Sequence, residues 1–158
     1  MVLEKTIHNK AEYYPYVFQV LNKFYDLSLT NNEIKVLSLL CEKRNELLVG
    51  KSKKSKCSDC GKDFGEGKDV CDACESTNIT YDIPPEINDM LFSKSIRRSI
   101  IADLNMDYYV FNNIVSVLRN SKQLITKNQI HPFFNFLANS KKGVDLTFKV
   151  KFTDGSDK

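Results

Sequence analysis

Hydrophobic and polar residues repeat with helical periodicity between Ser93 and Asn120, and a short break divides the pattern into two helices. The first helix has an apolar side formed by Ile96, Ile100, Ile101 and Leu104. The turn is placed at residues 104–107, because Asp107 is a good N-cap whose carboxylate accepts hydrogen bonds from free helical amides. In the second helix, one face holds Val110, Phe111, Ile114, Val115, Val117 and Leu118, and the other holds Tyr109, Asn112, Asn113, Ser116, Arg119 and Asn120.

Two further helices are predicted before this pair. Residues 13–27 place apolar side chains at helical spacing with Pro15 tolerated in the first turn, and these side chains are Val17, Val20 or Leu21, Phe24 and Tyr25. Thr30 and Glu33 form a capping box, and the helix that they start is expected to run to about Asn45. Its buried stripe contains Ile34, Leu37, Leu40 and Cys41. Cys41 is interpreted as a small hydrophobic core residue, since an apolar environment disfavours a nucleophilic thiolate.

Short strands complete the expected elements. Leu124–Ile125 and Gln129–Ile130 are predicted to form a hairpin around Lys127 and Asn128. Alternating apolar residues also predict strands at 78–83 and 144–152, and residues 85–92 are expected to form a short helix. Residues 131–136, with three phenylalanines, are expected to pack the hairpin against the core, with His131 in a structural role.

The polar face of the 107–120 helix suits the major groove of DNA, where Asn and Arg can make paired hydrogen bonds to base edges. An amphipathic helix with a merely solvated side is the alternative. Charge favours DNA, because residues 93–127 hold six basic residues against two acidic ones, and basic side chains provide most phosphate contacts. The candidate DNA-binding residues are Arg97, Arg98, Tyr108, Tyr109, Asn112, Asn113, Ser116, Arg119 and Lys127.

The order of helix, tight turn, helix and hairpin resembles the winged helix-turn-helix family, in particular MarR-like repressors. In this resemblance Met106, Phe111, Ile114 and Leu118 take core positions, residues 108–116 face the groove and residues 126–129 form the wing. The resemblance covers about forty residues. This chain departs from the pattern at Lys122–Gln123, where the family often has a single glycine.

Two CxxC pairs, Cys57 with Cys60 and Cys71 with Cys74, form the strongest motif in the chain. Four thiolates make a closed tetrahedral site, which predicts one structural Zn²⁺. Disulfides are the alternative, disfavoured by the lack of a secretory signal, and an iron centre of rubredoxin type uses the same ligands. Six acidic residues surround two lysines between 57 and 75, so this segment is expected to face away from DNA and to contact a basic protein surface or to stiffen a loop.

The expected fold class is α+β, a winged helix-turn-helix core with an inserted zinc ribbon and a C-terminal strand. Residues 1–49 would supply the N-terminal helices, 50–83 the zinc ribbon, 84–152 the helix-turn-helix, wing and last strand, and 153–158 a disordered tail. Residues 1–11 are expected to be frayed, and residues 47–49 are expected to pair with 78–83 as a stalk carrying the cysteines. The polar run 50–56 is interpreted as a flexible connection.

Composition excludes several functional classes. No apolar run approaches the roughly 20 residues that span a bilayer, so no membrane partner is expected, and the first ten residues lack the apolar core of a signal peptide. Phosphate-loop, dinucleotide-binding and HExxH motifs are absent, so an enzyme is not expected.

The prediction is a cytoplasmic transcription or replication regulator that binds double-stranded DNA. The alternative is a structural or protein-interaction component, of the kind found in phage virions or assembly, contacting partners or a second copy through its N-terminal aromatic residues or acidic insert.

Overall fold

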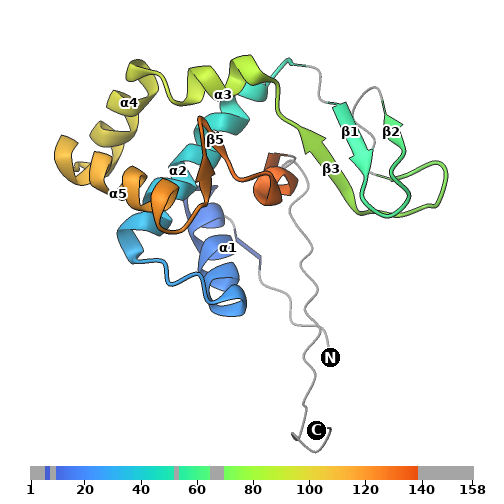
Figure 1. The fold of residues 1–158 in the computed structure, drawn as a ribbon, viewed down its shortest axis with the longest axis horizontal. Coiled ribbons are helices and arrows are strands. Elements are labelled where there is room, and N and C mark those ends of the chain that lie inside the picture. Colours follow the sequence, from blue (N-terminus) through green and yellow to red (C-terminus); the bar gives the residue numbers. More distant parts are fainter. Residues whose placement is uncertain (1–5, 8–9, 52–53, 65–69, 139–158) are drawn as a thin grey trace, which may run out of the picture.

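Helices make up most of the α+β fold, and strands are confined to two small antiparallel sheets (Figure 1). The structure is a computed structural model that describes residues 6–7, 10–51, 54–64 and 70–138. The helices are α1 (Lys10–Tyr25), α2 (Asn31–Leu48), α3 (Pro85–Leu91), α4 (Lys94–Leu104), α5 (Tyr108–Asn120) and the 3-10 helix η1 (Pro132–Ala138). The strands are β1 (Lys54–Cys57), β2 (Asp63–Phe64), β3 (Ile79–Asp82), β4 (Ile125–Thr126) and β5 (Gln129–Ile130).

Helix α1 begins earlier than its sequence pattern predicts. It starts at Lys10, so Pro15 lies inside the helix and not in its first turn, and the expectation of a frayed start to residue 11 is wrong at its last two residues. Its buried face is formed by Tyr14, Val17, Phe18 and Leu21. Phe24 and Tyr25, which were expected on that face, are 49% and 55% exposed because they lie in the last turn, at the edge of the core.

Helix α2 confirms the predicted capping box and extends beyond its predicted end. The amide of Glu33 donates to Thr30 Oγ1 at 3.3 Å, and the amide of Thr30 donates to Glu33 Oε2 at 2.9 Å. The helix continues to Leu48, so residues 47–48 are not a strand. Cys41 is fully buried in the core, and this burial raises the pKa of its thiol to about 11 despite the opposing effect of Arg44.

The predicted order of α4, turn, α5 and hairpin is confirmed. Asn105 ends α4 in the left-handed conformation, with φ 46°, and Asp107 Oδ1 accepts a hydrogen bond of 2.8 Å from the amide of Tyr109. Ile100, Phe111 and Leu118 are buried in the main core. The hairpin pairs Ile125 with Ile130 and Thr126 with Gln129. These contacts hold α4, α5 and the hairpin on one helical scaffold.

The second sheet has the strand order β2-β1-β3. The strand at Ile79–Asp82 is confirmed, but its partner is Lys54–Cys57 and not residues 47–49. The run from 50 to 56 was interpreted as flexible, yet residues 54–56 belong to β1, in which exposed Lys54 and Lys56 alternate with buried Ser55 and Cys57. We call β1, β2, β3 and the two CxxC turns, residues 54–64 and 70–82, the cysteine ribbon.

Two clusters of buried side chains hold the fold together. The main core joins α1, α2, α4, α5, the hairpin and η1. The ribbon cluster consists of Leu48, Cys57, Phe64, Cys71, Ile79, Tyr81, Ile87 and Ala138, and Leu47 packs against both clusters. In η1, Phe134 is buried and Phe136 packs on the main core, as expected, whereas Phe133 is 47% exposed.

Some sequence predictions fall outside this description. The predicted strand at 144–152 and the tail at 153–158 lie outside the described residues. Among the helices of the described ranges, none combines the length and apolar character that crossing a membrane requires.

Candidate metal centre and candidate nucleic-acid interface

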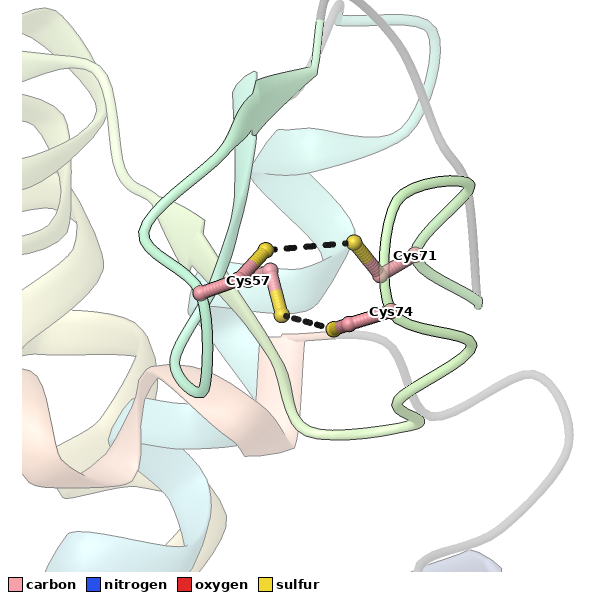
Figure 2. A group of neighbouring side chains, drawn as sticks. Cys57, Cys71 and Cys74 are labelled. Carbon is pink, nitrogen blue, oxygen red and sulfur yellow. Dashed lines mark hydrogen bonds between the residues drawn. The ribbon is translucent and has the colours of Figure 1, made fainter.

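The four cysteine sulfurs predicted to bind metal lie within 4.8 Å of one another. Cys57 Sγ is 3.6 Å from Cys74 Sγ, and Cys60 Sγ is 3.5 Å from Cys71 Sγ, so each contact joins the two CxxC turns (Figure 2). Four thiolates about 2.3 Å from a tetrahedral ion would be roughly 3.8 Å apart, whereas disulfide sulfurs are about 2.05 Å apart. The arrangement fits a tetrahedral metal ion, and the cysteines are free thiols.

Both CxxC turns have the same backbone hydrogen bonds, which explains why the sulfurs converge. In the first, the amide of Cys57 donates to Lys62 O at 2.9 Å, and that of Gly61 donates to Cys57 O at 2.9 Å. In the second, Cys71 donates to Ser76 O at 2.9 Å and Glu75 to Cys71 O at 2.8 Å. The residue after each second cysteine therefore has a positive φ, 75° at Gly61 and 56° at Glu75.

Because Gly61 and Glu75 occupy equivalent positions, substitutions at the two are expected to differ in their effect on metal binding. Gly61→Ala is expected to weaken metal binding about 10-fold, because the left-handed conformation costs a residue with a Cβ about 1–2 kcal/mol. A Cβ at Gly61 meets no atom within 4 Å, so this cost comes from φ alone. Glu75→Gly should maintain or improve binding, because it removes the same cost. Competition for the metal with a chromophoric chelator measures both changes.

Ser58→Ala provides the matched control, because Ser58 is an exposed residue of the same turn. Its metal affinity should equal that of the unchanged chain. If Gly61→Ala and Ser58→Ala bind metal equally well, the conformation at position 61 does not determine the geometry of the thiols.

The pKa values of Cys57 and Cys74 are shifted in opposite directions. The backbone amide of Cys60, followed by that of Asp59, lowers the pKa of Cys57 to about 7, although desolvation opposes the change. For Cys74, hydrogen bonding by the Ser76 amide lowers the pKa, but desolvation and the neighbouring thiols outweigh it and raise the pKa to about 12. Thiolates this close together repel one another. A bound divalent cation would offset this repulsion and allow all four thiols to ionise.

Asp59 connects the two halves of the cysteine ribbon. Its carboxylate accepts hydrogen bonds from the Ser76 hydroxyl and, at 3.3 Å, from Asn78 Nδ2, and these bonds lower its pKa, with Ser76 the larger cause. Sequence reasoning counted Asp59 only as a surface charge. Asp63, Asp72 and Glu75 are exposed as expected, and the other two acids of the segment, Glu66 and Asp69, lie outside the described residues.

The residues predicted to bind DNA lie on α4, α5 and the tip of the hairpin. Most are open to solvent: Tyr108 is 52% exposed, Tyr109 is 80% exposed, and Arg98, Asn113, Ser116 and Lys127 are exposed. Arg97, Asn112 and Arg119 are half-buried. Hydrogen bonds with the side chains of Asn112 and then Arg97 lower the pKa of Tyr108, so these three side chains meet where α4 approaches α5. Arg119 differs, because its Nε is buried and has no hydrogen-bond partner among the residues that the structure describes.

Two charges counted in this basic stretch are engaged elsewhere. Lys122 Nζ lies 2.5 Å from Glu33 Oε2 and also donates to the carbonyl of Ser28, so it ties α5's end to the capping box of α2. Asp103 pairs with Lys43 at 3.6 Å. The two pairings offset each other, so the remaining positive charge is concentrated on α4, α5 and the hairpin tip.

The same chain was compared with models of protein families, with curated proteins and with solved structures. None of the three comparisons found a match. The choice of function therefore depends on the geometry and chemistry of this chain's own residues.

Proposed function

We propose that the protein is a non-enzymatic regulator of transcription or replication that binds duplex DNA through a winged helix-turn-helix. The observation that carries this proposal is the uncovered polar face of α5, on which Asn113 and Ser116 are exposed and Asn112 is partly exposed. The alternative, an ordinary solvated helix face, does not explain why a tyrosine as exposed as Tyr109 lies there. Exposed tyrosine beside amides and guanidinium groups is suited to contacts with sugars, phosphates and base edges.

The neighbouring elements support this orientation. Helix α5 would enter the major groove, as the second helix of a helix-turn-helix does. Arg98 on α4 and Lys127 at the hairpin tip are both exposed, so they could contact phosphates on either side of the groove. In this proposal β4 and β5 form the wing, and Lys127 is its tip.

The cysteine ribbon is proposed to be a zinc ribbon inserted between α2 and α3 of the winged helix. Its four thiols have the number and spacing of a closed Zn²⁺ site, and a closed site leaves no position for water. The ion would therefore be structural. Within the described residues, the exposed acids of the ribbon would be repelled by phosphate, so the ribbon is proposed to face away from DNA.

A second candidate, a protein-interaction or assembly module, is favoured by the exposed aromatic residues near the end of α1. Tyr25 and Phe133 are 55% and 47% exposed, and their rings pack edge to face at 5.5 Å. Exposed aromatic side chains are enriched at protein interfaces. A protein partner or a second copy of the chain would bind there.

Selection of bound sequences from random duplexes, followed by titration with salt, tests the DNA proposal. Asn113→Ala is expected to lose about 1–3 kcal/mol of discrimination at one base pair, because its amide reads a base edge. Arg98→Ala and Lys127→Ala should each reduce the slope of log affinity against log salt by about 1, with sequence preference unchanged.

Lys23→Ala is the control, because Lys23 is an exposed cation on α1 and is outside α4, α5 and the hairpin, which are proposed to contact DNA. Its affinity and salt slope should match those of the unchanged chain. Absence of salt-dependent binding to every selected duplex contradicts the DNA proposal, and loss of a partner or dimer in Phe133→Ala would then support the second candidate.

A further inference from the structure

Helix α3 lies between the cysteine ribbon and the proposed DNA-binding unit (Figure 1). It has only seven residues, Pro85–Leu91, and both of its buried side chains are 1% exposed. Ile87 belongs to the ribbon cluster, whereas Leu91 belongs to the main core. A single short helix therefore packs on both clusters at once.

The cluster on the ribbon side of α3 includes part of the metal site. Cys57 and Cys71 are fully buried members of the cluster that contains Ile87, together with Ile79 and Tyr81 of β3. The strands have only two to four residues each, and such short strands are marginally stable without further support. Ile87 shares this cluster with ribbon residues and with Leu48 of α2 and Ala138 of η1. A metal that joins the two CxxC turns would order the ribbon part of the cluster.

The other side of α3 contacts the unit proposed to bind DNA. Asn88 Nδ2 donates to Gln129 Oε1 of β5 at 3.4 Å, and α3 contacts both β5 and α4. Only Phe92 and Ser93 separate α3 from α4, and Ser93 caps α4 by accepting a hydrogen bond from the Ile96 amide at 3.4 Å. A shift of α3 would therefore disturb both the hairpin and the start of α4.

We propose that metal occupancy of the four-cysteine site regulates the DNA-binding surface through α3. With metal bound, the ribbon cluster fixes Ile87, and α3 then holds the β4–β5 hairpin and the α4 cap in place. Without metal, the ribbon part of the cluster around Ile87 loses its order, α3 is held less firmly, and the hairpin loosens. The effect on DNA rests on the proposed function, whereas the coupling between metal and hairpin does not.

Hydrogen exchange on the full chain, with Zn²⁺ bound and after removal by a chelator, tests the coupling without DNA. The informative amide is that of His131, which donates to the carbonyl of Leu124 at 2.8 Å and closes the hairpin. Its exchange should be about 5-fold faster or more in the stripped chain. The amide of Leu21, in α1 of the main core, is the internal control and should not change. Faster exchange confined to residues 54–82 would overturn the proposal.

Substitutions in α3 test whether this helix transmits the effect. Ile87→Ala should still bind Zn²⁺, but the difference in His131 exchange between the loaded and stripped states should disappear. Asp89→Ala, an exposed residue of the same helix, should retain the full difference. If Ile87→Ala does not fold, Asn88→Ala replaces it, and the difference should then fall without loss of metal. If the α3 variant that folds keeps the full difference in His131 exchange between the loaded and stripped states, α3 does not transmit the effect.

Affinity for a mixed-sequence duplex at fixed salt gives a separate readout. Zn²⁺ should raise DNA affinity about 5-fold or more, and DNA should raise Zn²⁺ affinity by the same factor, because coupling between two binding sites is reciprocal. If neither state binds DNA while His131 exchange still responds to metal, the proposed function fails and the coupling stands. If DNA binds equally with and without metal, regulation by metal is wrong and the proposed function stands.

Discussion

Purified protein is expected to contain one zinc ion per chain, and Cys74→Ser is expected to lose it. Cys74 is exposed, so its replacement removes a ligand with little effect on packing. Substitution of a residue that only hydrogen-bonds to a metal ligand lowers metal affinity roughly 10- to 100-fold. Removal of a ligand itself should lower the affinity by more than this. Elemental analysis measures the metal and separates zinc from iron. Circular dichroism and exchange should show the cysteine ribbon unfolding while α1, α2 and α5 keep their structure, because the main core contains none of the four ligands.

Two other cysteines sharpen this experiment. Cys41→Ala is the matched control, since Cys41 is the remaining cysteine and is buried in the main core away from the cluster; it should retain stoichiometric metal. Cys71→Ser should lose metal as Cys74→Ser does and should also destabilise the ribbon cluster, in which Cys71 is fully buried. Stoichiometric zinc in Cys74→Ser, or none in the unchanged chain, would contradict a four-cysteine metal site.

Local chemistry explains which parts of the fold the sequence predicted well. Asp107 and Thr30 cap helices through bonds to amides two or three residues away, so a short window of sequence is enough to identify them. The CxxC pairs are equally local, because each turn closes through hydrogen bonds between residues four or five apart. The α+β class and the clustering of the four cysteines follow from such signals.

Contacts between distant residues explain what the sequence did not predict. Lys54 and Lys56 make β1 a polar strand, and its partners in β3 are 22 to 28 residues away. No local pattern identifies that pairing. Residues 47–48 continue α2, with Leu48 buried in the ribbon cluster and Leu47 packed against both clusters. Lys122 was counted as a cation available to phosphate, but its partner Glu33 is 89 residues away. The sequence around Glu75 does not indicate a positive φ at that residue. Only the equivalent position of Gly61 in the first CxxC turn identifies it.

Arg44 was also missed, and its replacement is expected to destabilise the helical core strongly. It lies in α2, is 1% exposed, and donates from Nη2 to the carbonyl of Phe134 at 2.9 Å and from Nη1 to Asn135 Oδ1 at 3.3 Å. Among the described residues, no carboxylate pairs with it, and its Nε is buried without a partner. Arg44→Ala should lower the free energy of unfolding by about 3–5 kcal/mol, because it leaves a cavity and removes the donor from a buried carbonyl.

Arg44→Met separates the two causes of this loss. Methionine fills much of the same volume but donates no hydrogen bond, so the expected loss is smaller, about 1–3 kcal/mol. Lys35→Ala is the control, as an exposed cation on α2, and should change stability by less than about 0.5 kcal/mol. Denaturant unfolding of metal-loaded protein measures all three variants. Equal stability of Arg44→Met and the unchanged chain would mean that the hydrogen bonds to η1 only offset the cost of burying the guanidinium. Equal stability of Arg44→Ala and Lys35→Ala would contradict a role for Arg44 in joining η1 to α2.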